Sequence, residues 1–145
     1  SGVPVVILRV PGIYAPGKLP VDRLKKGLPV LRAEDSPYTN RNHASDLVDV
    51  CIHAMQHGHN GEAYNVSDGH PTTKCDYFLK LAAHLDLPEP PIIDRAGAEK
   101  QLTPGMLSFL QESIRVSNMK LLSQLNVQLR YPDLDCGLAS IPKVN

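Results

Sequence analysis

Residues 8–17 read Leu-Arg-Val-Pro-Gly-Ile-Tyr-Ala-Pro-Gly and join an apolar stretch to a segment rich in proline and glycine. Residues 3–10 are mostly apolar and β-branched, which predicts a strand buried on both faces of a parallel or mixed sheet. Open α/β sheets hold their ligands at the carboxyl ends of such strands. This stretch therefore predicts an α/β fold with a ligand site in the loop that begins at Pro11.

The predicted elements alternate as in a doubly wound fold. After the first strand we expect a short helix at residues 19–26, a helix at 45–57 capped by Ser45, a strand at 62–66, and a second amphipathic helix opened by the capping sequence Thr73-Lys-Cys-Asp76. Prolines end that helix after Leu87. Beyond them we expect an extended piece at 92–93, helices at 104–113 and 118–125, and a broken tail.

Composition indicates one globular domain of 145 residues, with 42% hydrophobic and 21% charged residues. The net charge is zero, which argues against a nucleic-acid binder. No apolar run approaches the length of a membrane span, and no signal peptide is seen. Three widely spaced cysteines favour reduced thiols in the cytoplasm over a disulfide framework.

Two short patterns imitate catalytic motifs. Tyr14 and Lys18 match Tyr-x-x-x-Lys, but Pro16 and Gly17 lie between them and would break the helical turn that such a pair needs. We interpret this match as a coincidence. His53 and His57 have the spacing of a zinc pair but lack a neighbouring glutamate and a third ligand, so we interpret them as helix-end charges and expect no metal.

The sequence Arg41-Asn-His43-Ala-Ser-Asp-Leu47 precedes and opens a predicted helix. Arg41 and His43 would contact an anion or polar ligand at the helix N-terminus, or His43 would be a buried packing residue; both readings remain open. No Gly-x-Gly-x-x-Gly, Walker or Gly-x-Ser-x-Gly sequence occurs.

Three segments in this order resemble the second half of the extended short-chain dehydrogenase/reductase family, and most closely its NAD-dependent epimerase/dehydratase members. They are Arg9-Val-Pro-Gly-Ile-Tyr-Ala-Pro-Gly17, Arg41 to Leu47, and Tyr64-Asn-Val-Ser-Asp-Gly69. The resemblance implies an α/β fold: the C-terminal part of a Rossmann-like doubly wound sheet plus a mostly helical substrate-binding lobe. Residues 1–87 would hold the last strands and helices of the Rossmann-like domain with a substrate-loop insertion, and residues 88–145 the C-terminal segment of the substrate lobe.

The resemblance also implies NAD or NADP as the cofactor of the full-length parent. Its reactive end would lie against Pro11, Gly12, Ile13 and Tyr14, and the substrate against Lys18, Arg41 and His43. The Gly-rich loop and the catalytic Ser, Tyr and Lys belong to the family's first half, so no residue here is expected to be catalytic. Sugar-nucleotide members carry a diphosphate-binding arginine where this chain has Thr39, which argues against such a substrate.

We therefore expect the substrate-binding part of an NAD(P)-dependent epimerase, dehydratase or reductase (an isomerase or oxidoreductase), inactive by itself. Its expected partners are a small-molecule substrate such as a sugar or another hydroxyl compound, the preceding half of the same protein, and a second copy if the parent is a homo-oligomer; nucleic acid and membrane are not expected. The alternative is a non-catalytic dinucleotide-binding sensor or scaffold. A free-standing module would need partners for the strand at 3–10 within this chain.

Overall fold

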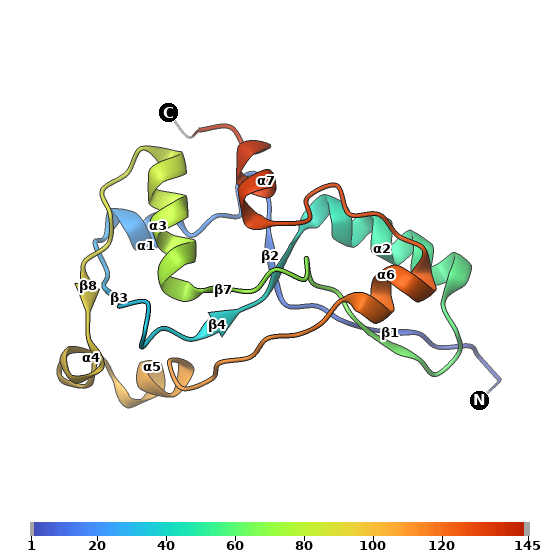
Figure 1. Ribbon diagram of the computed structural model, residues 1–145, viewed down its shortest axis with the longest axis horizontal. Helices are drawn as coiled ribbons and strands as arrows, with labels where there is room; N and C mark the ends of the chain where they lie inside the picture. The colour runs from blue at the N-terminus through green and yellow to red at the C-terminus, as the bar shows by residue number, and fades with distance from the viewer. Residues whose placement is uncertain (1, 144–145) are drawn as a thin grey trace.

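A computed structural model describes residues 2–143 and shows two packed regions joined by short strands (Figure 1). In the first region, β1 (Ile7–Arg9) pairs in parallel with β6 (Ala63–Asn65), and helices α2 (Ala44–His57) and α6 (Met119–Leu125) pack beside them. Its core contains Val50, Tyr64, Val66, Leu121 and Leu125. No helix within residues 2–143 is long and apolar enough to cross a membrane.

The second region is built around α3 (Lys74–Leu85), with α1 (Val21–Lys25) and α7 (Leu134–Ala139) sharing its core. The parallel strands β3 (Val30–Leu31) and β8 (Ile92–Ile93), followed by α4 (Arg95–Gln101) and α5 (Pro104–Phe109), complete this region. Figure 1 shows α4 and α5 at the end of the molecule opposite to β1.

Two strand pairs connect the regions. β2 (Gly12–Tyr14) runs parallel to β5 (Arg41–His43), and β4 (Tyr38–Thr39) runs antiparallel to β7 (Thr72–Thr73). The mixed α/β class with parallel strands is the class predicted from the sequence. The strands form four separate pairs within residues 2–143.

The expected strand at residues 3–10 is shorter and less buried than predicted. Only residues 7–9 belong to β1, and Val3 and Val5 are 68% and 52% exposed. The reason is that β1 has a partner on one edge only among the described residues. The loop predicted to follow Pro11 contains β2 instead, because β5 provides hydrogen-bonding partners for residues 12–14.

Several helix predictions need correction. Ser45 does not cap α2; His43 is the N-cap, and its Nδ1 accepts a hydrogen bond from the Ser45 amide at 3.1 Å. Thr73 caps α3 as predicted, accepting from the Asp76 amide. The helix predicted at 104–113 ends at Phe109, four residues early. Short helices α4 and α7 were not predicted.

The segment after residue 87 packs on both of the regions described above. Helix α6 packs on α2 and β6, and α7 packs on α3, so the chain returns to both earlier regions. The division into residues 1–87 and 88–145 stays a prediction, and it has to accommodate these returning helices.

Candidate functional site

The carboxyl ends of β2 and β5 lie together in the middle of the molecule. Gly12 is opposite Arg41, and Tyr14 is opposite His43. Parallel strands place their carboxyl ends on the same edge, which is the usual location of ligand sites in α/β sheets. Of the predicted cofactor and substrate residues, Gly12, Ile13, Tyr14, Arg41 and His43 lie on this strand pair, whereas Pro11 precedes β2 and Lys18 follows it.

The Tyr14 side chain is buried against His43, with the two rings edge-on and their centroids 5.2 Å apart. Its hydroxyl donates to the backbone carbonyl of Asp133 at 3.4 Å. Burial, reinforced by the charge of Asp68, raises the pKa of the Tyr14 phenol well above its usual range. Lys18 lies in an exposed turn after β2, so the two residues share no helix face and do not form a catalytic pair.

His43 is a buried structural residue. Its ring lies between Tyr14 and Tyr131, with 4.2 Å separating the His43 and Tyr131 ring centroids. Because Nδ1 accepts the Ser45 amide proton, the neutral ring carries its proton on Nε2, which is buried without a partner among the described residues. Burial lowers the pKa of His43, opposed by the charge of Asp46, and favours this neutral form. The packing interpretation of His43 agrees with this geometry.

Arg41 is the buried cation of the site. Its guanidinium donates to Thr72 Oγ1 at 2.6 Å and to Thr39 Oγ1 at 2.5 Å, and it lies over the ring of Tyr77, 4.4 Å from the centroid. No ion pair joins it to a carboxylate in the part of the chain that the structure describes. Burial lowers the pKa of Arg41. A buried positive charge held only by hydroxyls and a ring is suited to an anionic ligand.

A cavity of about 200 Å³ unites several of these residues. Of the predicted site residues it contains Gly12, Ile13, Tyr14 and Arg41, while Pro11, Lys18 and His43 lie outside it; the remaining lining residues are Thr39, Asn40, Lys74, Tyr77 and Phe78. We call it the central cavity. The sequence did not predict Lys74 and Tyr77 as site residues. Their pattern indicates a helix but does not show that the first turn of this helix faces β2 and β5.

Asp68 was also missed, because the pair Asp68-Gly69 indicates an ordinary turn. In the structure it is buried near Arg41 and Tyr14; Oδ1 accepts from the His70 amide at 2.8 Å, and Oδ2 has no partner among the described residues. Burial raises the pKa of Asp68, although the His70 amide and the Arg41 charge oppose the shift.

The raised pKa gives a prediction for stability against pH. The folded chain binds this proton more tightly than the unfolded chain, so the stabilising effect is complete below the unfolded pKa and is lost as pH rises through the folded pKa. We expect Asp68→Asn to be more stable relative to the native chain at pH 8 than at pH 4. Urea unfolding at both pH values measures this, with Asp22→Asn on exposed α1 as the control. An equal difference at both pH values would contradict the assignment.

The histidine pair predicted to lack a metal lies at the end of α2. The His53 and His57 ring centroids are 5.7 Å apart, and His53 Nδ1 lies 3.0 Å from the carbonyl oxygen of Leu125, which joins α2 to α6. Residues 2–143 contain no group of three or more His, Cys, Asp or Glu side chains placed to hold a metal ion. Cys51, Cys75 and Cys136 are all free thiols.

Several solved structures have an architecture similar to that of this chain. No protein-family model and no curated protein matches the chain. A conserved protein of unknown function from Silicibacter pomeroyi is 33% identical, with a TM-score of 0.82 over 94% of this chain and 48% of that one. A human epimerase family protein solved with NADPH is 18% identical, with a TM-score of 0.73 over 94% and 47%. UDP-glucose 4-epimerase from Thermotoga maritima, solved with UDP-glucose, is 21% identical, with a TM-score of 0.68 over 94% and 44%.

The chain has the fold of the C-terminal part of NAD-dependent epimerase/dehydratase structures. It spans about half the length of the solved structures that it matches. The predicted fold class is thereby confirmed. Among these epimerase/dehydratase structures, several hold NADPH or NAD.

Proposed function

We propose that this chain is the substrate-binding half of an NAD(P)-dependent epimerase, dehydratase or reductase of the extended short-chain dehydrogenase/reductase family, acting in the cytoplasm. The observation that carries the proposal is the central cavity, which lies along β2 and the amino end of β5 and is lined by the buried Arg41, a cation with no carboxylate partner among the described residues. The epimerase/dehydratase fold and the dinucleotides held by its solved examples support it.

In this proposal the nicotinamide end of the cofactor lies beside residues 11–14. Gly12 is exposed and leaves backbone accessible, and the Ile13 side chain is 45% exposed despite being apolar. These features fit an apolar ring approaching the strand closely. When bound, the dinucleotide supplies hydride transfer to or from a hydroxyl or carbonyl carbon. This chain would orient the substrate and exclude water. Lys18, in the loop after β2, and the buried His43 would border the site.

Arg41 would bind an anionic group or a polar oxygen of the substrate. Two of its donors are used by threonine hydroxyls, which leaves its charge unneutralised within the described residues. Its guanidinium contacts Thr39, the residue that stands where the resembling sugar-nucleotide enzymes carry a diphosphate-binding arginine. Arg41 stands two residues after Thr39 in the sequence and would supply a positive charge beside the Thr39 position.

The exposed surface around β1 is suited to a partner that contributes strands of its own. Among residues 2–143, β1 pairs on one edge only, and a groove of about 460 Å³ lies between β1 and α2. Parallel sheets are normally extended by further strands and covered on both faces. Val48, Ile52 and Met55 form an exposed apolar row along α2. We propose that the nucleotide-binding half of the parent protein covers this face and brings the catalytic groups, so that the chain alone is inactive.

The test compares the chain alone with a fusion in which it follows the amino-terminal part of the Silicibacter pomeroyi relative that it does not cover. We expect NADPH or NADH binding, followed by fluorescence, and turnover of hydroxyl or carbonyl substrates only with the fusion. Arg41→Met in the fusion should raise KM and leave dinucleotide affinity unchanged.

Turnover by the chain alone would contradict the proposal. Dinucleotide binding by the fusion without turnover of any substrate would favour the non-catalytic sensor or scaffold instead.

A further inference from the structure

A second cavity adjoins the central cavity and has a different character. It measures about 180 Å³, and its walls are mainly aliphatic and aromatic side chains of β3, β8, α4, α5 and the residues flanking them. We call it the apolar cavity; its apolar lining residues are Pro29, Val30, Leu31, Ile93, Leu102, Met106, Phe109 and Leu110.

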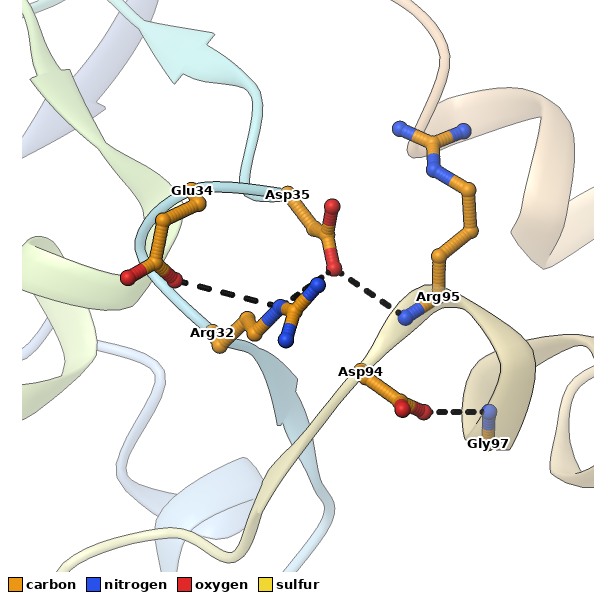
Figure 2. Close-up of polar contacts among 6 residues, drawn as sticks. All are labelled: Arg32, Glu34, Asp35, Asp94, Arg95 and Gly97. Atoms are coloured by element: carbon orange, nitrogen blue, oxygen red, sulfur yellow. Dashed lines mark hydrogen bonds and ion pairs between the residues drawn. The ribbon is translucent and has the colours of Figure 1, made fainter.

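Polar contacts join the residues that follow β3 and β8, directly after the lining residues Leu31 and Ile93 (Figure 2). Arg32, just after β3, donates from Nε to Asp35 at 2.7 Å, and the same carboxylate accepts from the Arg95 amide at 3.2 Å. Asp94 caps α4 by accepting from the Gly97 amide at 2.7 Å. These contacts tie the start of α4 to the turn after β3, so the two walls of the cavity are held together without any ligand.

Two cations lie at the other side of the apolar cavity. Arg23 donates to the Pro29 carbonyl at 2.9 Å and lies over the Phe78 ring, 5.2 Å from its centroid, while its Nε is buried without a partner among the described residues. Lys74 forms no ion pair within residues 2–143. Burial lowers the pKa of Lys74, and the nearby charge of Arg23 lowers it further. Two half-buried like charges without a carboxylate partner among the described residues are suited to binding an anion.

Lys74 lines both the apolar cavity and the central cavity. A group bound to Lys74 therefore lies at the junction between them, with apolar walls on one side and residues 12–14 on the other. We propose that the substrate is an aliphatic hydroxy or oxo acid whose carboxylate binds Lys74 and Arg23, whose hydrocarbon chain fills the apolar cavity, and whose reacting carbon faces Gly12 and Ile13. This substrate class rests on the proposed function.

The lining disfavours a nucleotide base in the apolar cavity. Among the described residues that line it, Ser36 is the only polar side chain besides the two cations, and its oxygen already accepts from the Cys75 amide at 3.0 Å. The ring N–H and carbonyl groups of a base would be desolvated against leucine, methionine and phenylalanine with few partners, which is costly. A hydrocarbon chain has no such groups.

The test uses the chain itself, without dinucleotide, and hexanoate, hexanol and UDP as probes. Leucine methyl resonances report binding at Leu102 and Leu110. We expect hexanoate to bind about tenfold more tightly than hexanol, which has the same chain without the charge. Lys74→Met and Arg23→Gln should each remove most of this preference, whereas Lys26→Met, an equal charge change at an exposed residue, should retain it.

Equal binding of hexanoate and hexanol, tighter binding of UDP, or shifts confined to other residues would overturn the proposal. These binding experiments need no cofactor, so their failure would reject the substrate class alone. The proposed function is tested separately, by turnover of the fusion.

Discussion

Asp46→Asn is expected to destabilise the chain by about 3 kcal/mol, although the two side chains have the same shape. Asp46 is fully buried in the first turn of α2, and its two oxygens accept from the backbone amides of Arg130 and Tyr131 at 2.8 Å and 3.0 Å. An asparagine keeps one oxygen acceptor for one of these amides. Its NH₂ group would face the other backbone amide, so these two N–H donors would lack a partner. Urea unfolding of the two proteins measures the loss.

Asp49→Asn is the matched control, because Asp49 lies on the same helix and contacts the same residue. It binds the Arg130 side chain at 2.9 Å in an ion pair whose arginine is exposed and whose carboxylate is half-buried, and such a pair is worth about 1 kcal/mol or less. Similar losses in the two variants would show that Asp46 does not fix the segment before α7. That segment carries Tyr131, which packs on His43, so the Asp46 contacts also hold the base of the site.

Gly137→Ala is expected to cost about 1–3 kcal/mol, even though alanine favours helices. A Cβ atom at this position of α7 would lie 1.8 Å from the Tyr14 hydroxyl and 2.5 Å from Cζ. Tyr14 has no room to withdraw, since its ring is buried against His43. Glycine is required here by the close approach of α7 to β2.

Gly105→Ala provides the comparison in another helix. Nothing lies within 4 Å of a Cβ atom built at Gly105 in α5, so this variant should be as stable as the native chain or slightly more so. Thermal unfolding of both variants separates helix propensity from packing. If Gly137→Ala unfolds at the native temperature or above it, the packing of α7 on Tyr14 is wrong.

The sequence predicted the parts of the fold that depend on local signals. The amphipathic pattern of residues 74–85 and the Thr73 cap specify α3, and Gly58 ends α2, because periodicity and capping act within a few residues. Helix α7 has six residues with a glycine inside, and its packing on α3 and Tyr14 stabilises it. Such a helix carries almost no signal in its own sequence.

The site was predicted only in part for a related reason. The pattern from Arg41 to Leu47 indicated a ligand or a packing role; in the structure His43 packs on Tyr131, and Arg41 lines the central cavity. Arg23 and Lys74 are separated by fifty residues of sequence and converge only because α1 and α3 share a core. No spacing rule could have joined them.

The central claim is that residues 11–14 receive a nicotinamide when the nucleotide-binding half is present, and the Ile13 methyl resonance tests it most directly. We predict that NADPH or NADH, added to the fusion with the Silicibacter pomeroyi amino-terminal part, shifts this resonance in a saturable manner, and that the same titration leaves the chain alone unchanged. Dinucleotide bound to the fusion with the Ile13 resonance unmoved would contradict the account.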